Sequence, residues 1–85
     1  MTNNKPAATI KDGAIKATIW RNDSEKGAFY SVDLVRGYTT GEKTPDGKDV
    51  WKETTSLSGS ELLKGANLLQ SAYNIILNLK AQDAA

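Results

Sequence analysis

The chain has 85 residues, with 11 basic and 10 acidic side chains, a net charge of +1, no cysteine and no histidine. This composition excludes disulfides, and neither zinc nor any other cofactor is expected. The near-neutral charge is not typical of a protein that coats DNA through a uniformly basic surface. No apolar run approaches the ~18 residues of a membrane span, and the N-terminus has no apolar signal segment. No membrane association is therefore expected, and the cytosol is the expected location.

Four β-strands are predicted, because short segments of alternating apolar and polar residues are separated by turn sequences. The predicted strands cover residues 8–11, 14–21, 28–39 and 50–57, with Asp12-Gly13 as the first turn. The polar segment 22–27 is predicted to be a loop. Segment 41–49, centred on Pro45-Asp46-Gly47, is predicted to be a second hairpin connection.

One long helix is predicted from about Glu61 to Lys80, with Ser58 or Ser60 as its N-terminal cap. Most positions of this helix are apolar. Its polar side chains form a narrow stripe, here called the polar stripe, that consists of Lys64, Asn67, Ser71, Asn74 and Asn78. A helix that covers one sheet needs an apolar arc of little more than ~100°, so the surplus apolar surface predicts a partner subunit. The expected dimer interface consists of Leu68, Ala72, Ile75, Ile76 and Leu79.

The expected architecture is therefore α+β: a curled four-stranded antiparallel sheet and a long C-terminal helix, in the order β-β-β-β-α, assembled as a homodimer. Residues 9–80 form the expected single domain. Segments 1–8 and 81–85 lack apolar anchors and are expected to be flexible tails. A core of this size supplies only ~3–5 kcal/mol by itself, which is a second reason to expect an oligomer.

Enzymatic activity is not expected. Nucleophilic and acid–base catalysis usually depends on His, Cys or a juxtaposed pair of carboxylates. Asp33 and Glu53 are the acidic residues within the predicted strands and could lie side by side. Such carboxylates more often form ion pairs with neighbouring lysines than take part in catalysis. No small-molecule substrate is indicated.

The predicted sheet face opposite the helix combines aromatic and basic side chains. Trp20 and Phe29 lie on neighbouring predicted strands, and Lys16 and Lys52 are assigned to the same face. Single-stranded nucleic acid is bound by such surfaces, because bases stack on aromatic rings and lysine meets phosphate. The alternative is a cross-strand aromatic pair that packs on itself or on a partner chain. Trp51, on the opposite parity from Lys52, is predicted to lie in the core.

Several short motifs, in order, resemble those of a known family. They are Ile10-Lys11-Asp12-Gly13, Lys26-Gly27, Val32-Asp33-Leu34, Tyr38, Pro45-Asp46-Gly47 and Thr55-Ser56-Leu57. With them, residues 8–79 resemble the positive cofactor four family of single-stranded-DNA-binding transcriptional coactivators, which has bacterial and phage relatives. The resemblance implies a homodimer with curved sheets, and implies DNA-binding roles for Lys26, Tyr38 and Lys52.

The function predicted from the sequence is therefore binding of single-stranded DNA or RNA by a homodimer, in transcription, replication or repair. The candidate binding residues are Lys16, Trp20, Lys26, Phe29, Arg36, Tyr38 and Lys52. Arg36 and Tyr38 are included because the strand is expected to carry them beyond the end of the helix. A dimeric protein-interaction module without nucleic-acid binding is the alternative, and an enzyme is a third class that stays open.

Overall fold

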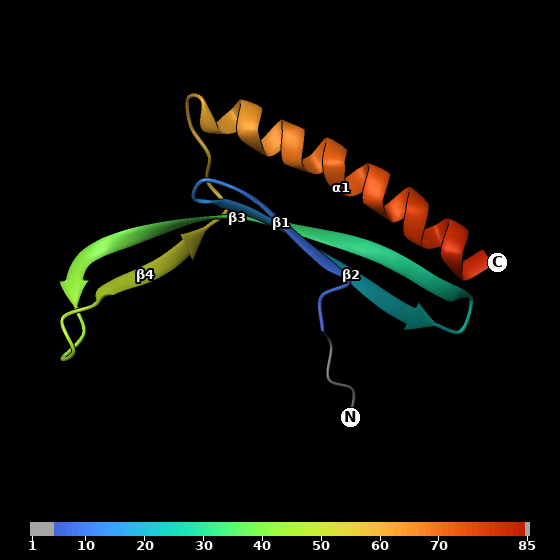
Figure 1. Ribbon diagram of the computed structural model, residues 1–85, viewed down its shortest axis with the longest axis horizontal. Helices are drawn as coiled ribbons and strands as arrows, with labels where there is room; N and C mark the ends of the chain where they lie inside the picture. Colours follow the sequence, from blue (N-terminus) through green and yellow to red (C-terminus); the bar gives the residue numbers. More distant parts are fainter. Residues whose placement is uncertain (1–4, 85) are drawn as a thin grey trace.

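In the computed structural model, which describes residues 5–84, one helix covers one face of a four-stranded antiparallel sheet (Figure 1). The strands lie side by side in chain order: β1 (Ala8–Asp12), β2 (Ile15–Ser24), β3 (Gly27–Lys43) and β4 (Asp49–Thr54). The helix α1 (Glu61–Ala84) follows them. The predicted α+β class, with four antiparallel strands and one C-terminal helix, is confirmed.

The hairpin between β2 and β3 is longer than predicted. Segment 22–27, predicted as a loop, continues the ladder up to the pair Ser24 and Gly27, so only Glu25 and Lys26 form the turn. Polar side chains are accommodated in this part of the ladder because the end of the hairpin is exposed to solvent. They also bond across the strands: Asn22 donates to the Ser31 hydroxyl over 3.0 Å.

The hairpin formed by β3 and β4 extends well beyond the helix (Figure 1). Its turn follows the prediction, since the Gly47 N–H donates to the Thr44 carbonyl and Pro45 occupies the second turn position. Gly47 has a φ of 84°, a left-handed conformation that side chains with a Cβ rarely adopt. The register between β3 and β4 shifts between Thr39 and Lys43, as at a β-bulge.

The hydrophobic core lies between β2 and α1. Ile15, Ala17 and Ile19 alternate along β2 towards the helix and are each at most 1% exposed. Leu68 and Ala72 meet them from α1, and neighbouring strands contribute side chains packed against the cluster, among them Ile10, Val32 and Leu34. The predicted alternation of β2 and of the first half of β3 is thus confirmed.

A turn stabilised by Glu61 precedes the helix. The Glu61 carboxylate accepts the backbone N–H of Ser58 over 3.0 Å, and the Glu61 N–H donates to the Ser58 carbonyl over 3.1 Å. Gly59 has a left-handed φ of 59°, so Ser58 does not adjoin the first helical turn, whereas the Ser60 carbonyl accepts the Lys64 N–H. Arg36 lies 3.4 Å from the Glu61 carboxylate and ties β3 to the start of α1.

The ends of the fold differ from the predicted tails. Residues 81–84 are helical, so the helix ends four residues later than predicted. At the other end, the Ala7 N–H donates to the Ile19 carbonyl, and Ala8 begins β1. The remaining parts of the predicted tails, residues 1–4 and 85, lie outside the described residues. Within residues 5–84 no helix is both long enough and apolar enough to cross a membrane.

A polar contact holds the last turn of α1 on the sheet. The Tyr30 hydroxyl donates to the Asp83 carboxylate over 2.6 Å, and the Arg21 guanidinium lies 3.4 Å from the same oxygen. The Tyr30 hydrogen bond, followed by the charge of Arg21, lowers the pKa of Asp83. The same hydrogen bond raises the pKa of Tyr30. The sequence pattern did not identify this contact, because Asp83 lies beyond the apolar period of the helix.

The Asp83→Asn substitution is expected to loosen the last helical turn without unfolding the domain, since the contact is exposed. The pKa of Asp83 is lower in the folded than in the unfolded chain. The stability that the Asp83 carboxylate contributes is therefore present above its unfolded pKa of ~4, and is lost as the pH falls through its folded pKa. Tyr30 sets the limit at high pH. Because the pKa of Tyr30 is raised on folding, the stability that its hydroxyl contributes is lost as the pH rises above ~10. Hydrogen exchange of the last-turn amides at neutral pH tests this. Unchanged exchange in Asp83→Asn would contradict the anchoring role.

Candidate nucleic-acid interface

The sheet face turned away from α1, here called the open face, is not covered by any element of the described chain. Register pairs place Lys16 beside Val35, Thr18 beside Asp33 and Trp20 beside Ser31 on this face. Lys11 joins them through its pairing with Lys16, and Glu53 through its ion pair with Lys16 at 3.2 Å. The open face therefore carries residues from all four strands.

Trp20 is fixed on the open face by its own polar atom. Its indole N–H donates to the Asp33 carboxylate over 2.9 Å, and the side chain is half-buried. The two strand carboxylates that were considered for catalysis have different partners. Asp33 accepts the hydrogen bond from Trp20, and Glu53 forms an ion pair with Lys16. They form no carboxylate pair.

Phe29 lies on the same face as Trp20 and is 52% exposed. It pairs with Asn22, two residues along from the Trp20–Ser31 pair, so the two aromatic side chains are diagonal neighbours. The predicted sharing of one face by Lys16, Trp20 and Phe29 is confirmed, and half of the Phe29 side chain remains available for a ligand.

The predicted sides of β4 are reversed. Trp51, predicted as core, is 63% exposed and pairs with Thr39, which places it on the open face. Lys52, predicted for the open face, pairs with Tyr38 on the opposite side. The prediction extended the alternation of β4 to Leu57, which is partly buried and packs against the core. However, β4 ends at Thr54, and the bend that follows breaks the alternation before the chain reaches Leu57.

Arg36, Tyr38 and Lys52 form a second cluster, here called the hairpin cluster, on the helix side of the projecting hairpin. The Arg36 guanidinium carbon lies 5.9 Å from the centre of the Tyr38 ring, a cation–π distance. Arg36 also donates to the Ser56 carbonyl over 3.2 Å. Arg36 is therefore partly engaged within the fold, whereas the side chains of Tyr38 and Lys52 are exposed.

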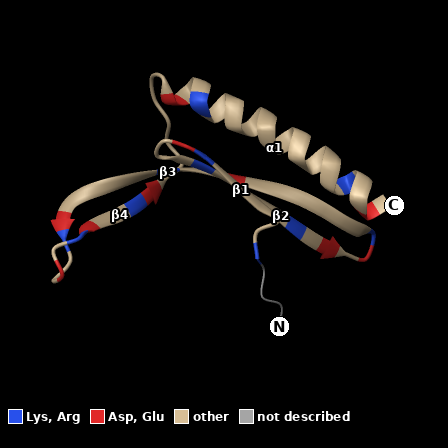
Figure 2. Cartoon of the chain, viewed as in Figure 1, with Lys and Arg blue, Asp and Glu red and all other residues tan. Residues whose placement is uncertain are grey.

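Lys26 lies apart from both surfaces, in the two-residue turn between β2 and β3. The structure thus divides the seven predicted binding residues among the open face (Lys16, Trp20 and Phe29), the hairpin cluster and this turn. It also adds two residues to the open face that sequence reasoning did not include, Trp51 and Lys11. Figure 2 shows that basic and acidic residues are interspersed along the β3–β4 hairpin rather than segregated.

The predicted dimer interface requires a correction. Leu68 and Ala72 are buried against the sheet of the same chain, so they belong to the core. Ile75, Ile76 and Leu79 are half-buried. The apolar side chains exposed on α1 lie mainly along a neighbouring stripe, here called the helix stripe: Leu62, Leu69, Tyr73 and Leu77. Their spacing of seven, four and four residues was visible in the sequence, but the pattern did not distinguish the stripe that meets the sheet from the one that does not.

No protein-family model matches this chain, and neither the curated proteins nor the solved structures include a significant match. Among residues 5–84 no group of three or more acidic side chains is arranged to hold a metal ion. The open face and the helix stripe are therefore the two surfaces from which a function can be inferred.

Proposed function

We propose that this protein binds single-stranded DNA or RNA as a homodimer, through the open face of its sheet. The observation that carries the proposal is that three aromatic side chains, Trp20, Phe29 and Trp51, share this uncovered face with Lys11 and Lys16. Exposed rings and lysines on one surface are what an unpaired strand requires, because its bases stack and its phosphates are anionic.

The exposure of the rings supports this proposal over a purely structural role. Phe29 and Trp51 leave more than half of their side chains in solvent. Stacking a base on an aromatic ring contributes ~1–3 kcal/mol and does not depend on base identity. The resemblance to the positive cofactor four family points to the same ligand, although the residues involved differ in part.

The homodimer is proposed from the helix stripe. Between Lys64 and Lys80 the helix carries no charged residue, and Leu69 and Tyr73 are 46% and 62% exposed (Figure 2). An exposed apolar stripe of this length is typical of a surface that packs against another chain. A second copy is the simplest partner, because antiparallel helices from two copies would cover both stripes at once.

Fluorescence-anisotropy titration with a labelled oligothymidine, at low and at physiological salt, tests the proposal. We expect binding that weakens with salt, by a slope of ~0.7 for each phosphate neutralised in a single strand. A duplex of the same length is expected to bind more weakly, because paired bases cannot present their faces to Phe29 and Trp51. Absence of binding to oligothymidine at low salt would overturn the proposal.

A dimeric protein-interaction module is the second candidate. It is favoured by the net charge of +1 and by the neutralisation of Lys16 by Glu53. In that case the wild-type protein would be a dimer in solution and would bind no oligonucleotide. The same titration, combined with light scattering, therefore separates the two candidates.

A further inference from the structure

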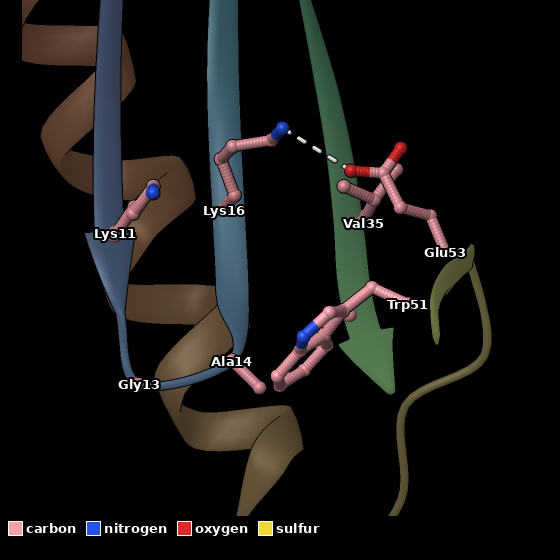
Figure 3. A pocket seen from close by; sticks show the side chains of 8 residues that line it. Lys11, Gly13, Ala14, Lys16, Val35, Trp51 and Glu53 are labelled. Carbon is pink, nitrogen blue, oxygen red and sulfur yellow. Dashed lines mark ion pairs between the residues drawn. The ribbon is translucent and has the colours of Figure 1, made fainter. Parts of the chain in front are cut away.

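A hollow of about 220 Å³ lies on the open face where the β1–β2 turn, β3 and β4 meet (Figure 3). Val35 and Gly37 from β3 lie beneath it, and Trp51 lies along one side. Lys11, Lys16 and Glu53 supply its charged groups. Figure 3 shows Lys16 and Glu53 extending towards each other across β3, with the Trp51 indole near Ala14.

Gly37 lines the hollow beside the Trp51 indole. A Cβ at this position would lie 3.6 Å from Cε3 of Trp51, which is an ordinary van der Waals contact, so the indole lies over the space that a small side chain on β3 would occupy. The Gly37 N–H donates to the Ala14 carbonyl over 2.8 Å, which holds the backbone of β3 in place. One part of the indole faces Gly37, while 63% of Trp51 remains exposed.

The size of the hollow restricts its ligand. Sites for drug-sized molecules occupy ~300–1,000 Å³, so this smaller space suits a single planar ring system rather than a whole cofactor. The exposed indole supplies a stacking surface for such a ring. A nucleobase meets both conditions.

The charged groups favour one base. Glu53 offers two carboxylate oxygens, which accept hydrogen bonds and donate none, and the Lys16 ammonium lies 3.2 Å from one of them. The two Glu53 oxygens and the Lys16 ammonium therefore form a row of two hydrogen-bond acceptors followed by one donor. Guanine carries the complementary row on its Watson–Crick edge: the 2-amino group and N1–H donate, and O6 accepts. Cytosine and adenine offer one amino donor, and thymine offers one N–H between two carbonyls, so none of these engages both oxygens with adjacent donors.

We infer that this hollow is a guanine-binding subsite on the path of the bound strand. Guanine stacks on Trp51, its N1–H and 2-amino groups donate to Glu53, and its O6 accepts from Lys16. Lys11, which has no ion-pair partner among the described residues, is placed to meet a neighbouring phosphate. The inference rests on the proposed function, because the base arrives as part of a single strand.

The test compares three oligonucleotides that differ at one central position: thymine throughout, one guanine, or one hypoxanthine. Hypoxanthine keeps N1–H and O6 but lacks the 2-amino group, so it removes one donor to Glu53. The guanine oligonucleotide is expected to bind about 5- to 10-fold more tightly than the other two, near the lower end of bidentate base readout. The lower end applies because the Glu53 side chain is 57% exposed and water competes for it.

Two variants of equal charge assign the preference to a residue. Glu53→Gln is expected to abolish the preference for guanine, because an amide offers one acceptor in place of two. Glu42→Gln changes the net charge equally at an exposed position of β3 outside the hollow, and is expected to keep the preference.

Each other result overturns the inference in a recognisable way. If all three oligonucleotides bind equally, or if Glu53→Gln keeps the preference, the guanine subsite is wrong while single-strand binding stands. If none binds, the proposed function and the subsite fail together. If guanosine monophosphate alone binds as tightly as the guanine oligonucleotide, the hollow serves a free nucleotide and not a strand.

Discussion

The Leu69→Glu variant is expected to be monomeric at concentrations at which the wild-type chain is dimeric. Leu69 lies within the helix stripe and is 46% exposed, so its side chain faces away from the core of its own subunit. In a symmetric dimer the substitution places one carboxylate from each subunit in the apolar interface. Burial of an unpaired charge costs several kcal/mol. The dimer dissociation constant is expected to rise by about 100-fold or more.

Sedimentation equilibrium or light scattering at micromolar concentration measures this change. Asn67→Glu is the matched control, because it introduces the same charge on the same helix within the polar stripe, and it is expected to remain dimeric. Both variants are expected to keep the wild-type circular dichroism spectrum, since neither residue lies in the core. A wild-type protein that is monomeric at micromolar concentration would remove the basis for the dimer.

The double variant Phe29→Ala/Trp51→Ala is expected to lose most of its affinity for oligothymidine. Each ring contributes ~1–3 kcal/mol of stacking, and the two lie at distant places on the open face, so their losses are expected to add. Binding is therefore expected to weaken by at least ~30-fold. The folded state is expected to persist, because both side chains are more than half exposed.

The hairpin cluster supplies the control for this experiment. Tyr38→Ala removes an exposed ring from the opposite side of the sheet, so it is expected to leave oligothymidine binding nearly unchanged. Lys52→Ala tests the same side through charge, and is expected to leave the salt slope unaltered. If these two variants weaken binding more than the double variant does, the strand follows the hairpin cluster and not the open face.

The order and type of every element were predictable from the sequence, because each depends on local patterns. Alternation in β2 identified Ile15, Ala17 and Ile19 as one apolar face, and these residues form the core. Pro45-Asp46-Gly47 identified the long hairpin through its turn chemistry. The predicted ends of the elements were less accurate, since polar residues at an exposed hairpin end continue the strand ladder without burying anything.

The candidate site was only partly predictable. Lys16, Trp20 and Phe29 were correctly assigned to one face because β2 and β3 are paired under the helix, where burial of alternate residues determines the register. Trp51 and Lys52 were assigned to the wrong sides because β4 pairs with the part of β3 that extends beyond the helix. Where both faces of a hairpin meet solvent, the apolar pattern does not indicate which side is which.

The sequence by itself determined the fold class, the four strands, the long C-terminal helix and the presence of more apolar helix surface than one sheet covers. These follow from periodicity, turn residues and composition, all of which act over short stretches of chain. Only the tertiary structure decided that Leu68 and Ala72 face the sheet while Leu69 and Tyr73 do not. It alone brought Lys16, Trp51 and Glu53 from two non-adjacent strands around Gly37. The physical reason is that such neighbourhoods depend on strand register and on the rotation of the helix over the sheet, which the packing of distant residues determines.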